Sequence, residues 1–335
     1  MNPFKENGYI KPVASINSMY IDDVLAYDTF RPAVLIDILE KNREILGISK
    51  GISGEQLLYV FHDVINSDIP SIKQKAMEIA IDFGDRLAKV ITNLKKPSDL
   101  SMKKRDNWTD EHWKFWHNIS KLYLVGGLTS PILTKIFYDR IELALKNKQI
   151  KDFDIVFIEG SKHLGTKGLS KVTENGEYLL FDFGQTNIKR RHFMKKNDLP
   201  IIDSILPSKK SDFLFYKYKN DDELKYIARL LDRYIINTIL DTIKLTDFKG
   251  DKMLISIANY VFDGKIYSGR GGYAKLAYIS DNYEKYLSLE LSKSLDRDIE
   301  LKLYHDTSAM ALYFDKLDKA AVISLGTAFG VAFID

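Results

Sequence analysis

The sequence of 335 residues contains no cysteine, which excludes disulfide bonds and thiolate metal sites and is typical of a protein in a reducing cytoplasm. No apolar run reaches the roughly 18 to 20 residues that a membrane-spanning helix needs. The opening residues, MNPFKENGYIKPV, lack the apolar core of a signal peptide. Only 8 prolines occur, and no proline-rich or low-complexity linker divides the chain. We therefore expect a cytoplasmic protein that does not enter the membrane.

The sequence also has no marked excess of positive or negative charge. The 49 basic and 46 acidic residues nearly balance at +3 and are spread along the chain, which argues against a nucleic-acid partner. Apolar residues make up 45% and charged residues 28%, as in ordinary globular proteins, and the length suffices for two domains. We expect a small-molecule partner, and the sequence leaves a homo-oligomer open.

Strand-like and helix-like patterns alternate in both halves of the chain, which predicts an α/β fold. Between about 31 and 147 the pattern is mostly helical, with apolar residues three and four apart in SIKQKAMEIAIDFGDRLAKVITNL. The polar and aromatic stretch SDLSMKKRDNWTDEHWKFWHN predicts a surface excursion that ends in a short helix. No composition change marks a domain boundary, so the boundary must be inferred from motifs.

The first such motif is DFGQTNIK, which follows the apolar run YLLF. Asp182 ends the expected strand, Gly184 permits a turn, Thr186 offers a hydroxyl and Lys189 adds positive charge. Backbone amides in a glycine turn can bind phosphates, and a carboxylate at this position can hold Mg²⁺ through water. A β-hairpin with a polar turn explains the same residues and stays open.

Two further glycine turns end expected strands. SLGTAFG places Gly326 and Thr327 between two apolar strands, and LVGGLTS places Gly126 and Gly127 before a helix that begins at Ser130-Pro131. Each turn is a weak signal alone. Together they indicate a ligand site, because α/β folds bind ligands at strand ends.

A fourth glycine-containing stretch, GSKHLGTKG at 160–168, nearly fits the P-loop pattern G-x-x-x-x-G-K-[ST]. Thr166 stands where that pattern requires lysine, and Lys167 comes one place late. We therefore do not interpret this stretch as a P-loop.

The stretch LKLYHDTSAMAL supplies a candidate base. Asp306 lies between an expected strand and a helix of small residues, beside His305, and a carboxylate there can accept a hydroxyl proton in phosphoryl transfer. A helix cap made by Asp, Thr and Ser is the structural alternative. In SGRGGYAKLAY, Arg270 or Lys275 can meet an anionic acceptor, or the segment is a solvated loop.

Taken together, these motifs resemble the two-lobed actin-like ATPase (ribonuclease H-like) fold, and most of all its ROK family (repressor, ORF, kinase). That family's D-x-G-x-T-x-x-K motif is matched at 182–189. Its Asn-Asp pair is matched by HDTSAMAL with His305 in the asparagine place, and its G-T-G-x-G loop by GTAFG with Ala328 in place of the middle glycine. Its G-G turn is matched by Gly126-Gly127, and its final strand and helix by FDIVFIEGSKHLGTKGLSKV.

The resemblance covers nearly the whole chain, but in rotated order, which implies a circular permutation. Residues 174–312 correspond to the lobe with the first phosphate motif and Asp306. Residues 313–335 followed by 1–173 correspond to the second lobe. The strand that ends at 335 would continue at 7–16, and GVAFID and NGYIKP would form a hairpin with Asn-Gly as its turn.

The resemblance implies an ATP-dependent kinase of a sugar or sugar-like alcohol. Phosphates would lie on the turns at 184–186 and 326–327, with Lys189 beside them, and adenosine against Gly126-Gly127. Asp306 would be the general base, and Asp182 would organise Mg²⁺ through water. His305 and Arg270 would contact the acceptor.

Two departures leave other functions open. The family's Glu-Gly-His element and its cysteine-rich zinc loop have no counterpart in KPVASINSMYIDDVLAYDTFRP, so zinc is not expected and glucose-type specificity is in doubt. A non-catalytic nucleotide- or sugar-binding regulator is the alternative, although no DNA-binding extension precedes the fold. Hydrolysis of a phosphate ester or polyphosphate on the same superfold is a third.

Overall fold

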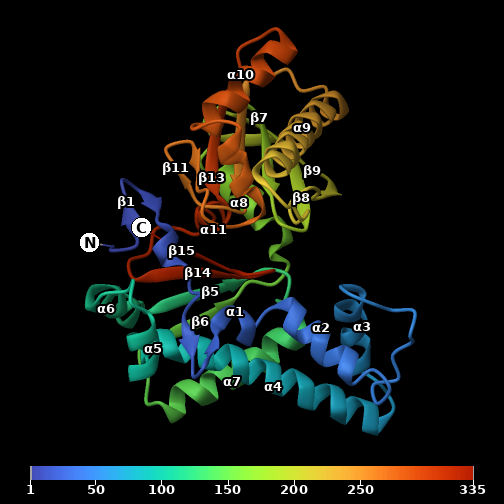
Figure 1. Ribbon diagram of the computed structural model, residues 1–335, viewed down its shortest axis with the longest axis vertical. Coiled ribbons are helices and arrows are strands. Elements are labelled where there is room, and N and C mark those ends of the chain that lie inside the picture. The colour runs from blue at the N-terminus through green and yellow to red at the C-terminus, as the bar shows by residue number, and fades with distance from the viewer. Residues whose placement is uncertain (1, 335) are drawn as a thin grey trace.

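A computed structural model describes residues 2–334, and it consists of two lobes, each built around one β-sheet (Figure 1). Both sheets contain parallel and antiparallel strands, and helices cover them, which confirms the predicted α/β class. No helix among residues 2–334 is both long and apolar enough to span a membrane.

The upper lobe in Figure 1 has a five-stranded sheet of order β13-β10-β7-β8-β9. Its strands are β7 (Gly176–Phe183), β8 (Asn187–Lys196), β9 (Leu199–Lys210), β10 (Lys252–Ile257) and β13 (Glu300–His305). β7, β10 and β13 run parallel, whereas β8 and β9 are antiparallel to their neighbours. Two amphipathic helices, α9 (Asp221–Thr246) and α10 (Tyr283–Leu295), bury their apolar sides against one face of this sheet.

The lower lobe has a four-stranded sheet of order β15-β14-β5-β6. Its strands are β5 (Lys121–Val125), β6 (Asp154–Phe157), β14 (Ala320–Leu325) and β15 (Phe329–Ile334). β14 and β15 form an antiparallel hairpin, and β5 and β6 continue the sheet in parallel from β14. This sheet therefore joins the last two strands of the described chain to two strands from the region 121–157.

Helices from the first half of the chain cover the outer face of the four-stranded sheet. They are α1 (Ala26–Thr29), α2 (Pro32–Lys41), α3 (Gln56–Ile65), α4 (Pro70–Lys95), α5 (Asp99–Lys104), α6 (Asp110–Asn118) and α7 (Pro131–Asn147). The segment 98–118, expected to be a surface excursion that ends in a short helix, does end in the helix α6, but it also forms α5 and buries Trp113 and Trp116 in this core. The interpretation as a surface excursion was wrong, because the polar residues there conceal large aromatic side chains that face inward.

Short hairpins and 3₁₀ turns complete the chain. The hairpins are β1 (Lys5–Glu6) with β2 (Tyr9–Ile10), β3 (Tyr20–Ile21) with β4 (Val24–Leu25), and β11 (Val261–Phe262) with β12 (Lys265–Ile266). The 3₁₀ turns are η1 (Pro12–Ala14), η2 (Ser161–His163) and η3 (Gly272–Tyr278).

Two short helices, α8 (Leu164–Lys171) and α11 (Asp306–Ala311), lie between the sheets (Figure 1). Each contributes to two apolar clusters. Leu164 and Ala311 pack on the four-stranded sheet, whereas Leu169 and Ala309 pack on the five-stranded one. Both lobes are therefore held on the same pair of helices.

The two sheets share one arrangement if β14 and β15 are counted before β5 and β6. Each sheet then begins with a hairpin, β7–β8 or β14–β15. Two further strands, β10 and β13 or β5 and β6, continue the sheet in parallel from the first strand of that hairpin. The chain ends are also close, since the Phe4 and Phe333 rings stack at 5.3 Å and Lys5 Nζ donates to the Phe333 carbonyl at 3.2 Å. The expected Asn-Gly turn is present, but it joins β1 to β2 and not β15 to residue 7, so that part of the prediction was wrong.

Candidate functional site

Asp182 sits at the centre of the carboxyl edge of the five-stranded sheet. In the sheet register it lies opposite Lys189 on β8 and Ser256 on β10. Lys189 Nζ donates to Asp182 Oδ2 at 2.9 Å and Ser256 Oγ donates to Oδ1 at 3.1 Å. Burial disfavours the charge on Lys189, but attraction to Asp182 outweighs it and raises the pKa of the ammonium. With the Asp182 side chain only 1% exposed, this is a nearly buried ion pair.

Hydrogen bonds from other residues of the upper lobe hold the turn that follows β7. Gly184 N lies 3.2 Å from the Asn187 carbonyl, which closes the turn, and Gly184 O accepts from Tyr273 Oη at 3.0 Å and from Ser211 Oγ at 2.7 Å. Thr186 is half-buried, and its carbonyl accepts from Ser211 N at 2.9 Å. The predicted first phosphate turn is therefore a rigid β-hairpin turn.

Asp306 follows β13 and begins α11, two strands away from Asp182 on the same edge. Its Oδ1 accepts from Thr307 N at 2.6 Å and from Thr307 Oγ1 at 3.2 Å. Burial, together with the nearby Asp182 carboxylate, raises the pKa of Asp306 to about 7. The side chain keeps 22% exposure, so a carboxyl group poised near neutrality faces outward from the sheet edge.

Thr307 also links this carboxyl group to the other lobe. Thr307 Oγ1 lies 3.4 Å from Ser324 Oγ on β14, and Ser324 Oγ accepts from Gly330 N on β15 at 3.1 Å. The turn between β14 and β15 carries the predicted Gly326 and Thr327. The structure thus places the Asp306 helix directly against the hairpin that carries the second glycine turn.

The Gly126-Gly127 turn lies beside the same hairpin. Gly126 has a φ of +116°, and a Cβ there would lie 2.7 Å from the Leu325 carbonyl oxygen, so only glycine fits. Gly126 N donates to Ser161 Oγ at 2.8 Å. Thr327 is exposed, Gly127 is exposed with open space around it, and Gly326 is partly exposed. The second and third glycine turns therefore form one edge, facing the lobe that carries Asp182.

The stretch 160–168, which resembled a P-loop only superficially, is the junction of these motifs. Ser161 contacts the Gly126 turn, and a Cβ at Gly165 would lie 3.0 Å from Asp182 Cγ. His163 immediately precedes α8 and lies near Asp182 and Lys189. Burial and the surrounding cations, Lys162 first, lower the pKa of His163. The stretch brings its backbone close to Asp182, but it forms a 3₁₀ turn and a helix and not a phosphate-binding loop.

The three side chains considered as acceptor contacts, His305, Arg270 and Lys275, are differently placed. His305 is 7% exposed and has both ring nitrogens facing protein groups, so it is buried beside Asp306 and presents no free nitrogen. Arg270 is exposed, and its Nη2 donates to the Pro12 carbonyl at 2.9 Å. Lys275 is buried and donates to three carbonyls, including that of Leu214 at 2.6 Å. The geometry lends no support to a direct acceptor contact by these three side chains.

A magnesium ion would find few protein ligands here. Residues 2–334 contain no group of three or more His, Asp or Glu side chains arranged for a metal. The Asp182 oxygens already accept from Lys189 and Ser256. This donor set fits an ion that reaches Asp182 through water and takes its other ligands from phosphates, as Mg²⁺ commonly does.

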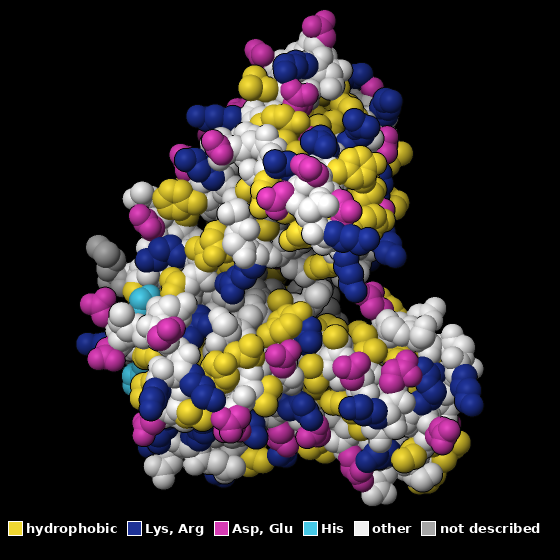
Figure 2. Space-filling model, viewed as in Figure 1, with side chains coloured by type: hydrophobic (Ala, Val, Ile, Leu, Met, Phe, Trp, Pro, Cys, Tyr) yellow, Lys and Arg dark blue, Asp and Glu magenta, His cyan; other side chains and the backbone are white. Residues whose placement is uncertain are grey.

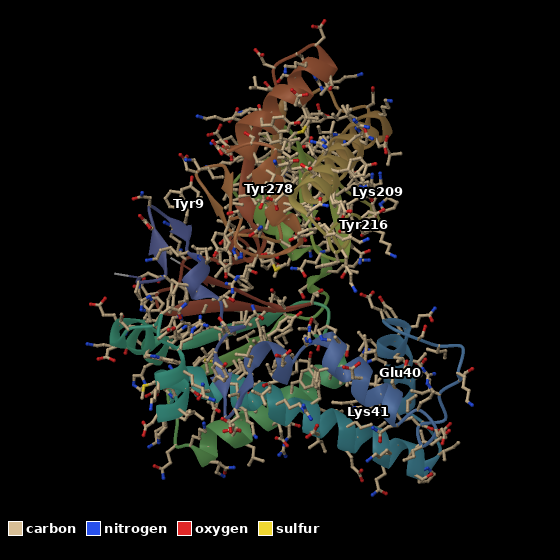
Figure 3. The ribbon with its side chains drawn as sticks, viewed as in Figure 1. Tyr9, Glu40, Lys41, Lys209, Tyr216 and Tyr278 are labelled. Carbon is tan, nitrogen blue, oxygen red and sulfur yellow. The ribbon has the colours of Figure 1, made fainter. Side chains whose placement is uncertain are left out.

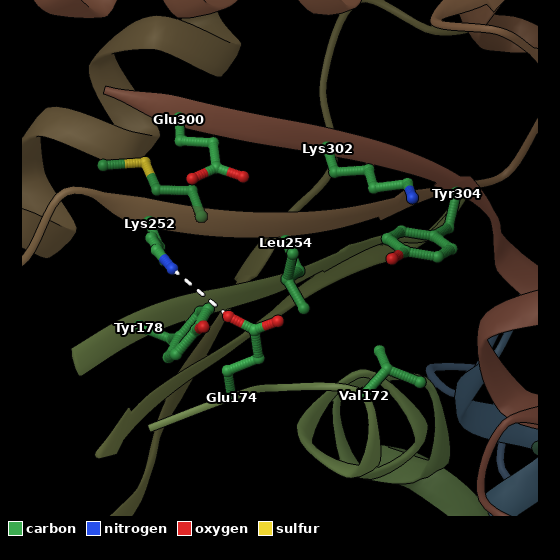
Figure 4. A pocket seen from close by; sticks show the side chains of 9 residues that line it. Val172, Glu174, Tyr178, Lys252, Leu254, Glu300, Lys302 and Tyr304 are labelled. Atoms are coloured by element: carbon green, nitrogen blue, oxygen red, sulfur yellow. Dashed lines mark ion pairs between the residues drawn. The ribbon is translucent and has the colours of Figure 1, made fainter. Parts of the chain in front are cut away.

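The surface is hollowed between the two lobes, as Figure 2 shows. A separate cavity of about 420 Å³ lies between α7 and β6 and is lined in part by Pro131, Thr134, Phe157 and Glu159, near the Gly126-Gly127 turn. Another recess, of about 210 Å³, lies along β7, β10 and β13, where Lys252 begins β10 and sits 3.7 Å from Glu174 (Figure 4). Neither cavity includes Asp182 or Asp306.

Comparisons with known proteins give little more. No family model and no curated protein matches the sequence. Among solved structures, the chain is similar to the Ppx/GppA phosphatase of Aquifex aeolicus, in its type II variant. The match has a TM-score of 0.32 and 10% sequence identity, and it covers 68% of this chain and 82% of that one. A score of this size does not establish a shared fold, and membership of the ROK family stays a prediction.

Several residues that shape the site escaped prediction. Ser256 donates a hydrogen bond to Asp182 and Thr307 donates to Asp306, yet neither residue belongs to the three predicted glycine turns. Ser256 was detectable in principle as a polar residue inside the apolar strand KMLISI. The contact between Gly165 and Asp182 had no local signal, because it joins residues from different lobes.

Proposed function

We propose that this chain binds ATP with Mg²⁺ between its lobes and transfers the terminal phosphoryl group to a hydroxyl of a sugar or sugar-like alcohol. The observation that carries the proposal is the convergence of Asp306, the Asp182–Lys189 pair and the β14–β15 turn at facing sheet edges. Asp182 and Asp306 are 124 residues apart in the chain, and no packing requirement explains why a carboxyl group with a pKa of about 7 is kept there.

Asp306 is suited to the role of general base. Thr307 holds Oδ1 through two hydrogen bonds, which leaves Oδ2 to accept the acceptor's proton. The acceptor oxygen then forms its bond to the terminal phosphorus as the bond to the ADP oxygen breaks. A base with a pKa near the working pH combines a useful ionised fraction with a real affinity for the proton.

The remaining groups serve charge and position. Lys189 supplies positive charge at the β7–β8 turn, and Mg²⁺, when bound, neutralises phosphate charge. We assign the Gly326-Thr327 turn to phosphate oxygens on the opposite side, because Thr327 is exposed and Gly326 is partly exposed. The cavity beside Gly126-Gly127 is the place we assign to adenosine, because it opens at the start of α7 next to that turn.

The proposal includes the fold on which it rests. We infer an actin-like ATPase fold of the ROK type in which the chain is circularly permuted, with 174–312 as one lobe and 313–335 plus 1–173 as the other. The shared arrangement of the two sheets and the closeness of Phe4 to Phe333 support this reading. Joining the present ends and opening the chain near 174 should give a folded protein with the same activity.

The test is ADP formation from ATP across a panel of sugars, amino sugars and polyols, with a reaction that lacks acceptor. We expect ADP to form only with a suitable acceptor, and the rate to rise with pH through about 7 as Asp306 ionises. Asp306→Asn should remove transfer while leaving ATP affinity nearly unchanged.

Three results would contradict the proposal in different ways. Phosphate release without acceptor would make water the acceptor and the protein a hydrolase. ATP binding without turnover on any acceptor would favour the non-catalytic regulator. Full activity of Asp306→Asn would refute the base assignment.

A further inference from the structure

Tyr260 lies against the residue next to the proposed base. Its ring stacks on the His305 imidazole at 4.8 Å between centroids, with 7° between the planes. Tyr260 follows β10 and is half-buried, whereas His305 ends β13, so the stack joins neighbouring strand ends. A parallel stack of this kind fixes both the position and the tilt of the imidazole.

The orientation of the imidazole determines what it offers Asp306. His305 Nδ1 accepts from Ser308 N at 3.3 Å and lies 3.0 Å from Ser308 Oγ. An accepting Nδ1 places the proton of the neutral ring on Nε2, and Nε2 lies 3.3 Å from Asp306 Oδ1. Burial lowers the pKa of His305 to about 3, so the ring is neutral at physiological pH. His305 therefore turns an N–H edge toward the carboxyl group that the proposed mechanism uses.

Tyr260 is itself held from the other lobe. Arg270 lies over the Tyr260 ring at 5.7 Å and donates to the Pro12 carbonyl at 2.9 Å. Ser15 and Arg270 both interact with the Tyr260 hydroxyl. The N-terminal segment, residues 9–18, thus faces Tyr260 directly.

That segment is firmly attached to the lower lobe. Trp108 Nε1 donates to the Val13 carbonyl at 2.8 Å, and the buried Arg105 donates to the Ser15 carbonyl at 2.5 Å. Asn17 pairs with both backbone groups of Phe329 on β15, at 2.7 and 2.9 Å.

The segment also reaches the upper lobe at a second point. The Tyr9 ring lies 5.0 Å from Phe262, next to the β11–β12 hairpin in Figures 1 and 3. The contacts continue from the lower lobe through Tyr260 and His305 to Asp306.

We propose that Tyr260 is a positioning residue for Asp306, and that the N-terminal segment, bound to the lower lobe, holds Tyr260 on His305 so that the base is aligned only when the two lobes are engaged. This inference rests on the proposed role of Asp306. It assigns to residues 9–18 a function that their sequence did not suggest, and it gives His305 a role in orientation in place of a contact with the acceptor.

The experiment compares Tyr260→Leu, which removes the ring, with Tyr260→Phe, which keeps the ring and loses the hydroxyl. Tyr278→Leu is the matched control, because Tyr278 is a 52% exposed tyrosine in the same lobe (Figure 3). Steady-state kinetics over pH 5.5 to 9 and ¹⁵N NMR of the histidine rings are measured on the full chain.

We expect Tyr260→Leu to lower kcat by up to about 100-fold with little change in KM for ATP, because a misaligned base weakens the chemical step and not binding. Its pH profile should shift relative to the wild type, and the ¹⁵N signals should show that His305 has lost its single Nε2–H tautomer. Tyr260→Phe should retain most of the activity and the tautomer. Arg270→Gln should change kcat in the same direction as Tyr260→Leu but by less.

The outcomes separate this inference from the proposed function. If Asp306→Asn is inactive but Tyr260→Leu matches the wild type in kcat, pH profile and tautomer, the positioning role is refuted and the base assignment stands. If Asp306→Asn is fully active, the proposed function fails. The claim that Tyr260 orients His305 can still be tested in that case. A His305 tautomer that is unchanged in Tyr260→Leu would refute this claim without any measurement of activity.

Discussion

Asp306 should destabilise the folded protein at neutral pH, and this can be measured without knowing the substrate. The folded state raises the pKa of this carboxyl group from 3.8 to about 7 because the group is buried beside Asp182. Between about pH 4 and pH 7 the unfolded chain is ionised at this position, whereas the folded chain holds the proton. Stability contributed by the protonated group is complete below the unfolded pKa and is lost as the pH rises to the folded pKa.

The size of the effect follows from the same values. A pKa rise from 3.8 to about 7 corresponds to at most about 4 kcal/mol in the free energy of unfolding above pH 7. Asp306→Asn keeps the shape of the side chain and an oxygen for the Thr307 N–H, but it cannot ionise. We therefore expect the variant to be more stable than the wild type by up to about 4 kcal/mol at pH 8 and by about 1 kcal/mol at pH 4.5.

Urea unfolding followed by circular dichroism at both pH values provides the measurement. Asp139→Asn serves as the control, because Asp139 is 55% exposed and pairs with Lys135 on the surface of α7, and its effect should be small at both values. A stability difference for Asp306→Asn that does not grow with pH would refute the view that this carboxyl group is held in a strained, functional state.

Two further substitutions test how the site is built. Gly168→Ala would place a Cβ 1.8 Å from the Ala309 carbonyl oxygen, so α8 and α11 must separate. We expect the free energy of unfolding to fall by about 1–3 kcal/mol. Gly51→Ala is the control, because a Cβ at Gly51 meets no close neighbour, and it should change the stability very little. Wild-type stability of the Gly168 variant would show that the helix pair can move freely. Lys189→Met leaves the nearly buried Asp182 without its cation and should cost about 3–5 kcal/mol in the same assay, with Lys189→Arg much milder. A Met variant as stable as the wild type would mean that Asp182 is protonated or solvated there.

One strand escaped the sequence interpretation for a clear reason. β9 contains Pro200 and Pro207, and prolines inside an expected strand argue against it. The structure places β9 at the edge of its sheet, with only β8 as a partner, where a missing N–H on the open side has no consequence. The position of a strand within its sheet is a tertiary fact, so local propensity gave no prediction there.

What the sequence by itself determined is the set of strand ends. Apolar runs that stop at Asp182, Asp306, Gly126 and Gly326 are local patterns, and the structure has a strand that ends within one residue of each of them. Backbone propensity and side-chain alternation operate within a few residues, and for this reason these positions could be read without a fold.

Only the tertiary structure decided which side chains are free to act. Arg270, Lys275 and His305 all appeared available in the sequence. In the structure Arg270 donates to a carbonyl of the N-terminal segment, Lys275 donates to buried carbonyls, and His305 is stacked against a tyrosine. The pKa of Asp306 is equally a tertiary property, since burial and the charge of Asp182 arise only when segments distant in the chain meet. Availability and acidity depend on neighbours in space, and those neighbours are as much as 258 residues away, as Pro12 is from Arg270.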